Sequence, residues 1–450
     1  WDFYQKYLLL AIPMILQNAI TNLVSFQDNI MVGQLGTEQM SGVAIVNQLI
    51  FVYNLAIFGA VSAASIFGAQ YFGKGNHKGH MYSFRFKLYA TLLVTGGAIL
   101  LFLTKGSALI SLYLTDTVGN GATDLALQYG LEYLAIMMVG LIPFAVNQSY
   151  ATNIKETGQT FIPMLASFVA VGTNAILDYL MIFGIGPFPE LGVQGAALAT
   201  VIARYIEALI VVIWAHIHRG KNRYLEGAYT GFGIPLAELK AILIKGFPLM
   251  MNEVLWAAGM TTVTQCYSVR GLNVVAGLNI ASTITNLFNI VYLQLGSCIS
   301  IVVGQYLGAG KLEDAKDADN KMIVFSVFCC VIMAALMFVV GGFFPGIYNT
   351  TEEIRELATS FIAVSAIIMP FCAFSHASYF TLRSGGKTVV TFLFDSVFTW
   401  VIVVPAAYLL AHFTGLGIVS IYFLVQGTEL IKVIIGYLMV KSNVWVVQMV

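Results

Sequence analysis

The sequence predicts an all-α integral membrane protein with twelve transmembrane helices in two six-helix lobes. Three observations lead to this prediction: the composition, a regular succession of apolar stretches, and an internal repeat. Of the 450 residues, 58% are hydrophobic and only 10% are charged, whereas soluble domains carry about 25% charged residues. The formal net charge is zero, so no basic surface is available for nucleic acid. The composition therefore indicates a chain that folds in lipid.

Twelve stretches of about 20 apolar residues are long enough to cross a bilayer as helices. They are expected at residues 8–32, 42–69, 83–104, 129–152, 161–185, 193–216, 238–267, 275–305, 322–344, 356–381, 389–411 and 416–440. This number of spans predicts a multi-pass protein of the plasma membrane, which is the inner membrane in a two-membrane bacterium.

The charges of the connecting loops alternate along the chain. Basic residues gather in every second connection: Lys74, Lys78, Arg85, Lys87, Lys155, Arg219, Lys221, Arg223, Lys240, Lys245, Lys311, Lys316, Lys321, Arg383 and Lys387. The opposite connections carry only Lys105, Arg270 and Arg355. Because cytoplasmic loops are enriched in Lys and Arg, both termini and the long 217–237 link are expected in the cytoplasm.

An internal repeat divides the chain. Pro248 lies 235 residues after Pro13, and the same offset pairs residues 70–75 (QYFGKG) with 305–310 (QYLGAG). Repeats of this kind build transporter folds from two similar halves. We therefore expect an N-terminal six-helix lobe at 1–216, a cytoplasmic link at 217–237 and a C-terminal lobe at 238–450.

The repeat also predicts a symmetry. Because six is an even number, both lobes enter the membrane in the same direction. They are then related by a pseudo-two-fold axis along the membrane normal.

Polar residues in the N-terminal lobe form one candidate site. Asp28 lies inside the first span, where a carboxylate costs roughly 2.5 kcal/mol or more. Asn174 and Asp178 are four residues apart and share one helix face, and Thr200 lies in the next span. These groups supply hard oxygen ligands for a small cation such as Na⁺, or a carboxylate pair that shares a proton. The alternatives are a structural hydrogen-bond cluster, or an Asp28 that is solvated near the end of its span.

The C-terminal lobe holds its acid at a different position. Glu253 follows Pro248 by five residues, and its repeat partner is the amide Asn18. Its neighbour Met251 contributes to a soft apolar setting that suits a lipophilic cation. We therefore expect substrate binding or coupling at Glu253, Asn18 and Met251, with a neighbouring helix satisfying Glu253 as the alternative.

The remaining charged residues within spans are expected to have local roles. Asp395 begins the eleventh span and is expected to be a solvated interfacial acid. Arg204 with Glu207, and Glu429 with Lys432, are spaced three apart and are expected to form ion pairs along their own helices.

Catalytic and metal-binding motifs are missing from the sequence. Residues 384–388 (SGGKT) are similar to part of a phosphate-binding loop, but Thr381 stands where the first glycine is required. The five cysteines lie in apolar stretches without a CxxC or Cys/His cluster. We therefore expect no enzyme activity and no cofactor beyond a coupling ion.

Several segments together resemble the MATE (multidrug and toxic compound extrusion) family of cation-coupled exporters. The resemblance covers nearly the whole chain. Its most specific parts are Pro13 to Gly36 with Asp28 before IMVGQLG, the pair Asn174 and Asp178, residues 192–200 (GVQGAALAT), Asn252-Glu253 after Pro248, and residues 382–388 (LRSGGKT).

The family implies two lobes that form a V around a central cavity, with Na⁺ or H⁺ exchanged for organic cations. Carried over by position, its N-lobe cation site falls on Asp28, Asn174, Asp178 and Thr200, with the carbonyl of Ala196. The family's hinge proline matches Pro13, and the repeat places a second hinge at Pro248.

One departure from the family concerns the C-terminal lobe. Lys387 stands where many relatives have an acid, and the tenth span has His376 but no acid after Glu356. This pattern argues against a C-lobe site built on two carboxylates.

The sequence thus predicts a cation-coupled antiporter, driven by Na⁺ or H⁺, that exports lipophilic and often cationic drugs or toxins by alternating access. The expected partners are small organic cations and the lipid bilayer, with no obligate protein partner. One alternative is a flippase for lipid-linked or polysaccharide cargo, which favours a groove lined with Arg and Lys. The other is a membrane-embedded enzyme, for which no catalytic constellation is found.

Overall fold

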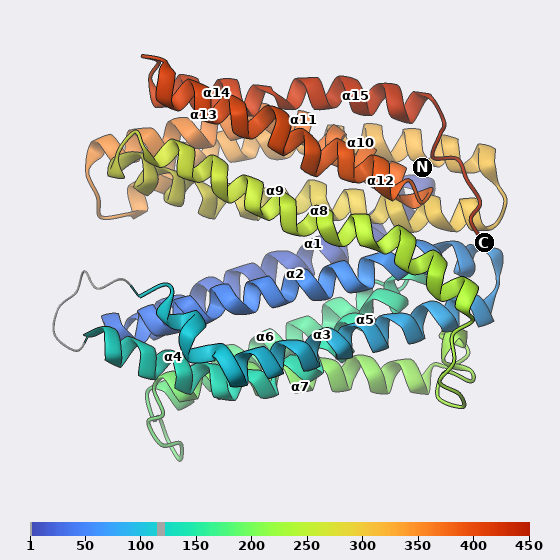
Figure 1. Cartoon of the computed structure of the whole chain (residues 1–450), viewed down its shortest axis with the longest axis horizontal. Helices are drawn as coiled ribbons and strands as arrows, with labels where there is room; N and C mark the ends of the chain where they lie inside the picture. Colours follow the sequence, from blue (N-terminus) through green and yellow to red (C-terminus); the bar gives the residue numbers. More distant parts are fainter. Residues whose placement is uncertain (1, 115–121) are drawn as a thin grey trace. The chain divides into compact units, whose positions relative to one another are not determined.

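The computed structural model describes residues 2–114 and 122–450, and this part of the chain is built almost entirely from helices (Figure 1). The first half contains α1 (Asp2–Gly33), α2 (Thr37–Lys74), α3 (His77–Ser111), α4 (Ala122–Val139), α5 (Leu141–Glu156), α6 (Phe161–Ile182) and α7 (Val193–Ile217). The second half contains α8 (Leu236–Ser268), α9 (Leu272–Gly308), α10 (Leu312–Phe343), α11 (Glu352–Ser384), α12 (Thr388–Phe392), α13 (Val404–Phe413), α14 (Ile418–Gly427) and α15 (Glu429–Lys441).

The helices reproduce the succession of predicted spans. Within the described residues, ten helical segments are long and apolar enough to cross a membrane, or eleven when the bent pair α4 and α5 counts as one span. In this count α12 to α13 form one segment and α14 to α15 another. Together with α1, which is 32 residues long, they account for the twelve predicted spans. The all-α membrane fold is confirmed.

One helix begins well before the predicted span. The apolar stretch was expected from residue 322, but α10 starts at Leu312. Its added turns are polar and carry the exposed pairs Lys316–Glu313 (2.8 Å) and Lys321–Asp317 (2.5 Å). Pairs spaced three or four apart stabilise a helix in water. A hydropathy criterion finds only the part of a helix that lies in lipid, so it misses such an extension.

The fourth span is bent where α4 meets α5. The two helices meet at 44°, and Pro143 lies in the first turn of α5. Proline has no backbone N–H and cannot donate to the carbonyl four residues earlier, which here belongs to Val139. The hydroxyl of Tyr205 donates to this carbonyl at 3.4 Å. The bend therefore has a local covalent cause, and a side chain of α7 occupies the freed acceptor.

The chain divides into two compact units. The N-terminal unit comprises residues 12–68 and 77–239, and the C-terminal unit comprises the chain up to residue 11, residues 69–76 and residues 240–450. The start of α1 and the end of α2 therefore pack with the second half of the sequence. The boundary in α1 falls next to Pro13, inside an unbroken helix. The lobe limits of 1–216 and 238–450 stay a prediction.

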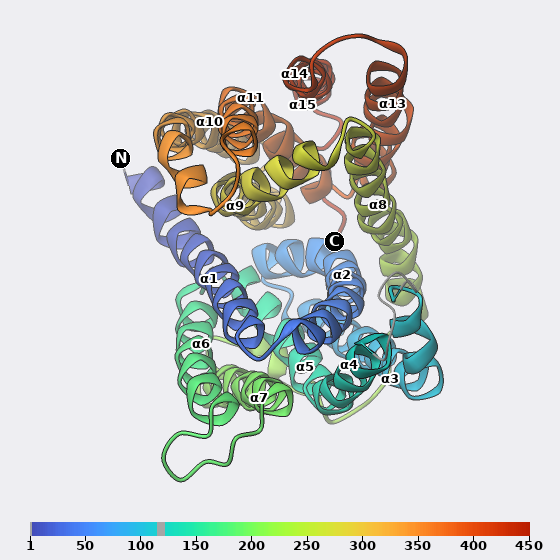
Figure 2. The same cartoon turned by 90° about the vertical axis from the view of Figure 1, so that its left-hand side faces the viewer.

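Within the N-terminal unit, α6 and α7 run side by side (Figure 2). Gly195 allows this approach, because a Cβ at this position would lie 2.6 Å from the carbonyl oxygen of Met181. Small residues let helices pack closely in membranes. This contact aligns the polar faces of α6 and α7, which carry Asn174 and Thr200.

A buried charged cluster joins α3 to α5 in the same unit. Lys87 Nζ donates to Glu156 and, at 2.5 Å, to Asn153 Oδ1. His80 Nε2 lies 3.1 Å from the other oxygen of Glu156. Lys87 is completely buried, and a buried charge is tolerated when it is paired and hydrogen-bonded. This cluster holds the ends of α3 and α5 together.

Two pairs of repeat partners make a reciprocal crossing within the C-terminal unit. A Cβ on Gly73 would overlap the backbone of Gln305, and a Cβ on Gly308 would overlap the backbone of Gln70. Gly73 and Gly308 are repeat partners, as are Gln70 and Gln305, because each pair is related by the offset of 235 residues. The ends of α2 and α9 therefore cross with the local two-fold relation that the repeat predicts.

Candidate functional site

The acid pair predicted in the N-terminal unit is present. Asp28 of α1 and Asp178 of α6 lie with their carboxyl groups within hydrogen-bonding reach of each other. Asp178 is fully buried. Both of its oxygens, and Oδ1 of Asp28, lack a hydrogen-bond donor from the described residues. Two adjacent carboxylates repel each other when both are ionised, so a proton or a cation would stabilise the pair.

The amide and hydroxyl predicted for this site also meet. Asn174 Nδ2 donates to Thr200 Oγ1 at 3.4 Å, and Thr200 Oγ1 donates to the Ala196 carbonyl at 3.0 Å. Asn174 lies one helical turn before Asp178 on α6. The structure therefore brings together all five residues that were expected to bind a cation. Their donor set is made of oxygen atoms, which suits a hard cation.

Two further residues at this site were missed by the sequence reasoning. Tyr133 of α4 is buried and close enough to interact electrostatically with Asp28 and Asp178. Its hydroxyl donates to Asn47 Oδ1 of α2 at 3.3 Å. Asn47 could have been found as an amide in an otherwise apolar span. Tyr133 carried no such signal, because tyrosine is common in membrane helices.

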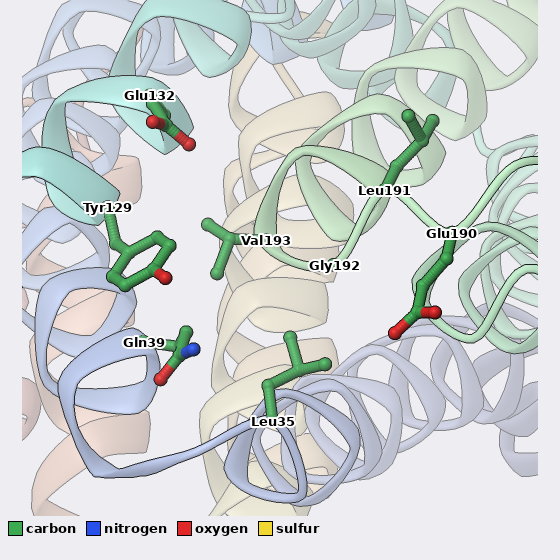
Figure 3. Close-up of a pocket in the computed structure, with 8 residues that line it drawn as sticks. All are labelled: Leu35, Gln39, Tyr129, Glu132, Glu190, Leu191, Gly192 and Val193. Carbon is green, nitrogen blue, oxygen red and sulfur yellow. The ribbon is translucent and has the colours of Figure 1, made fainter.

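A shallow pocket opens near one end of the same unit (Figure 3). It has a volume of about 360 Å³ and is lined by residues from the α1–α2 turn, from α4 and from the start of α7. The lining residues are Leu35, Gln39, Tyr129, Glu132, Glu190, Leu191, Gly192 and Val193. Glu132 directly precedes Tyr133, and Val193 lies one turn before Ala196. The pocket therefore adjoins the helix ends that carry the cation-site residues.

The acid of the C-terminal unit has a different environment. Glu253 of α8 interacts electrostatically with Arg383 and Asp395. Met250 and Trp256, three residues to either side of it, are exposed by 40% and 39%, which leaves an apolar face open beside the acid. Asn18, its repeat partner, donates from Nδ2 to the Met14 carbonyl of its own helix at 2.9 Å. Glu253 and Asn18 therefore have different surroundings, although they occupy equivalent positions in the repeat.

The expectation of a solvated interfacial Asp395 is wrong. Lys432 Nζ donates to Asp395 Oδ1 at 2.7 Å, and the Asp395 side chain is only 15% exposed. Asn252 Nδ2 donates to its other oxygen at 3.0 Å. Asp395 lies in a π-helical turn, Leu393–Val397, and such turns are frequent at functional sites.

Both ion pairs expected along single helices are also wrong. Lys432 pairs with Asp395 rather than with Glu429, whose Oε1 has no hydrogen-bond partner among the described residues. Glu207 accepts from Ser167 Oγ at 2.5 Å, while Arg204 donates to the Gly140 carbonyl at 3.4 Å. A pair spaced three apart contributes at most about 0.5 kcal/mol, so buried partners on other helices prevail.

The predicted hinges lie within helices. Pro13 is inside α1 and Pro248 inside α8. Each removes one backbone hydrogen bond from its helix. Whether these helices bend at the prolines during a transport cycle stays a prediction.

Comparison with known proteins decides the family. A model of the MatE family matches residues 13–180 and 248–409. The chain belongs to the MatE family. The two matched segments begin at Pro13 and Pro248, the pair that the repeat offset joins.

Relatives with related sequences cover nearly the same length. Probable multidrug resistance protein NorM from Thermotoga maritima is 23% identical over 93% of this chain and 88% of the relative. The protein of the same name from Halalkalibacterium halodurans is 24% identical over 91% of this chain and 88% of the relative.

Solved structures show the same fold. A crystal structure of MATE in a bent conformation superposes with a TM-score of 0.87 at 20% identity, over 98% of this chain and 96% of that chain. A MOP superfamily transporter from Pyrococcus furiosus gives 0.86 at 20% identity, over 97% and 95%. This MatE family chain is therefore a multi-pass membrane transporter, and the expectation that it is not an enzyme is confirmed by its family.

Proposed function

We propose that this transporter exports lipophilic and often cationic drugs or toxins in exchange for Na⁺ or H⁺. The observation that carries the proposal is the acid pair of Asp28 and Asp178, whose buried oxygens lack donors from the described residues. Such a pair is incomplete without a cation or a proton. The names of the relatives, which are probable multidrug resistance proteins, support the class of cargo.

Charge balance explains how a cation and a drug can exclude each other. With the site empty, two carboxylates repel each other. A bound Na⁺, or a proton placed on one carboxylate, relieves this repulsion and draws α1 toward α6. Since Asp28 lies about four turns beyond Pro13, a change in its position is transmitted to the part of α1 where a hinge is expected. Linkage then requires the cation and the drug to weaken each other's binding by the same factor.

Oxygen ligands from three elements would hold Na⁺ in this site. The candidates are the carboxylates of Asp28 and Asp178, the amide oxygen of Asn174, the hydroxyl of Thr200 and the Ala196 carbonyl. A proton needs only the two carboxylates, which would then share it in one hydrogen bond. Both ions therefore remain candidates for the coupling ion.

We assign the recognition of cationic cargo to the C-terminal unit. Glu253 offers a carboxylate beside the exposed side chains of Met250 and Trp256, and Met251 lies on the same turn. Aromatic faces and carboxylates both attract organic cations. Asp395 does not compete for this role, because Lys432 already neutralises it.

The buried basic residues do not favour the flippase alternative. A phosphate-binding groove needs cations that are available to the cargo. Here Lys87 is paired with Glu156, Lys432 with Asp395, and Arg204 is bound to a backbone carbonyl. These basic side chains therefore have partners within the protein and are not available to bind a phosphate group of the cargo.

The proposed orientation places both termini and the 217–237 link in the cytoplasm of a plasma membrane. The excess of Lys and Arg in alternate connections supports it. A single cysteine in place of the exposed Lys221 should then react only with reagents that enter the cytoplasm. Labelling of this cysteine by an impermeant reagent from outside would contradict the orientation.

The transport proposal is tested with purified protein in proteoliposomes. Ethidium efflux is followed under an imposed sodium gradient, an imposed proton gradient, or neither. We expect one of the two gradients to drive efflux and its absence to stop it. Efflux that is indifferent to both gradients would overturn cation coupling, while no transport of several unrelated lipophilic cations would overturn the proposed cargo.

A further inference from the structure

A second polar cluster lies in the N-terminal unit and is built around Glu207 of α7. Ser167 Oγ of α6 donates to the Glu207 carboxylate at 2.5 Å, and the side chain of Asn147 on α5 lies close to Glu207. Gln17 Nε2 of α1 donates to Ser167 Oγ at 2.8 Å. Four helices thus each contribute one polar side chain to the interior of the unit.

Two amide oxygens in this cluster have no donor. Gln17 Oε1 and Asn147 Oδ1 are buried and lack a hydrogen-bond partner among the described residues, and Asn147 is only 3% exposed. Gln17 is joined to the Glu207 cluster by its hydrogen bond to Ser167, and Asn147 lies beside Glu207. A buried acceptor without a donor is unfavourable, because it has lost its hydrogen bond to water without gaining another. An acid with two unused amide oxygens beside it is an environment that a cation would complete.

The cluster shares its helix faces with the acid pair. On α6, Ser167 precedes Asn174 by seven residues, and on α7, Glu207 follows Thr200 by seven. Residues seven apart lie on one helix face, about two turns or 10 Å from each other.

The first helix shows the same alignment. Gln17 precedes Asp28 by eleven residues, which is about three turns or 16 Å on one face of α1. The same faces of α1, α6 and α7 therefore carry first the acid pair and then the Glu207 cluster. The cluster lies toward the helix ends that adjoin the basic connections, which are the predicted cytoplasmic ends.

Two positive charges face Glu207. Arg204, one turn away on α7, and Lys155 of α5 both interact electrostatically with it. Arg204 is also held elsewhere, because it donates to the Gly140 carbonyl at 3.4 Å and its guanidinium carbon lies 5.0 Å from the centre of the Phe144 ring. A cation at Glu207 must therefore act against these charges. Binding there is weaker than at an acid pair without a basic neighbour, which suits a site that releases its ion.

We propose that Glu207, Asn147 and Gln17 form a second cation-binding site, through which the coupling cation passes between the acid pair and the predicted cytoplasmic face. The inference rests on the proposed function for the identity of the ion. Na⁺ would be bound by the carboxylate and the two unused amide oxygens. A proton would neutralise the carboxylate, whose new O–H would donate to one of these oxygens.

The direct test is difference infrared spectroscopy of the purified full chain, which detects carboxyl groups that change with their ligand. Sodium chloride is titrated against choline chloride at constant pH, and pH is titrated separately without sodium. The proteins are the wild type, Asp28→Asn, Glu207→Gln and Glu429→Gln. The last variant is a matched control, because it neutralises a half-buried acid of the other unit.

We expect the wild type to show two groups of carboxyl bands that respond to the cation. Glu207→Gln should lose one group, Asp28→Asn should lose the other, and Glu429→Gln should keep both. The inference is overturned if Glu207→Gln keeps every cation-sensitive band of the wild type. If Glu207→Gln loses cation-sensitive bands but Asp28→Asn loses none, the second site is supported and the proposed coupling role of the acid pair is contradicted.

A second variant keeps the test decisive if Glu207→Gln does not fold. Asn147→Ala retains the carboxylate but removes one of the proposed oxygen ligands. The sodium or proton midpoint of the Glu207 bands should then shift by about tenfold in concentration, as expected for the loss of one polar contact to a charge. An unchanged midpoint in this variant would contradict the site.

Discussion

Two acid sites of this transporter, one in each unit, differ in how their charge is balanced. In the C-terminal unit, Asp395 receives hydrogen bonds from Lys432 at 2.7 Å and Asn252 at 3.0 Å. In the N-terminal unit, Asp28 and Asp178 face each other, and three of their four oxygens lack a donor from the described residues. Asp395 has a counter-ion from its own chain, whereas the acid pair forms no salt bridge with a basic residue among the described residues.

This difference is the reason why we assign the proposed external cation to the acid pair. A buried ion pair is complete within the fold, so adding Na⁺ or H⁺ can only disturb it. An acid pair without a basic partner gains stability from any cation that reaches it. Sequence counts of acids alone could not separate the two cases, because both units have acids within their helices. The two cases are distinguished by whether a basic side chain such as Lys432 lies beside the acid.

The largest effect is expected from Asp28→Asn. This change removes the repulsion between the two acids and with it the need for a cation. Cation-driven efflux in proteoliposomes should fall to the level of protein-free vesicles, while the protein stays folded. Glu429→Gln, which neutralises an acid outside the site, should transport like the wild type. Full gradient-driven efflux by Asp28→Asn would remove the distinction between the two units.

The converse change in the C-terminal unit is Lys432→Met, which leaves Asp395 without its cation. Breaking a buried pair on one side costs about 3 kcal/mol or more in the free energy of unfolding. The double variant Asp395→Asn/Lys432→Met should recover most of this loss, since no lone charge remains. Unfolding in detergent, followed by tryptophan fluorescence, measures both. Equal stability of Lys432→Met and the wild type would contradict the structural role of the pair.

A smaller and more selective effect is expected from Glu253→Gln. In the proposed function this carboxylate attracts cationic cargo, and it is not part of the acid pair. Transport of several lipophilic cations should weaken, whereas the dependence of the remaining transport on the cation gradient should persist. Initial efflux rates over a series of drug concentrations test this. If transport of all the cations is unchanged, Glu253 has a structural role only.

The smallest effect is expected from Thr200→Ala. The Asn174–Thr200 hydrogen bond is long, at 3.4 Å, and a bond of ordinary strength is worth about 1 kcal/mol. The cation concentration that gives half-maximal efflux should therefore rise by less than about tenfold. Thr200→Ser, which keeps the hydroxyl, is the matched control. A complete loss of coupling in Thr200→Ala would show that this hydroxyl is more important than its geometry indicates.

Much of the fold followed from the sequence because lipid imposes simple rules. A helix that crosses the bilayer needs about 20 apolar residues, and this gave the twelve spans directly. The residues of the acid pair could be named for a similar reason, since few acids lie within spans. Their proximity followed from helix periodicity on α6 and from the small residues of α7, such as Gly195, that allow close packing.

The missed features all depend on packing between distant segments. Asp395 and Lys432 are 37 residues apart, so no local pattern joins them. The expected pair of Lys432 with Glu429 was favoured by spacing alone, but a buried carboxylate on another helix is the stronger partner. Tyr133 was missed because its residue type is ordinary in a membrane protein. Only its position beside Asp28 and Asp178 makes it notable.

The most direct test of the difference between the units is drug binding to purified protein, titrated against sodium and against pH. The wild type, Asp28→Asn, Asp178→Asn and the double variant are compared. We predict that one of the two ions weakens drug binding to the wild type, and that each single variant loses this sensitivity but still binds drug. The double variant should differ little from either single variant, because the two carboxylates act as one unit. Two results would contradict a cation site at the acid pair. One is drug binding to the wild type that depends on neither sodium nor pH, and the other is single variants whose drug binding keeps the full dependence on the ion.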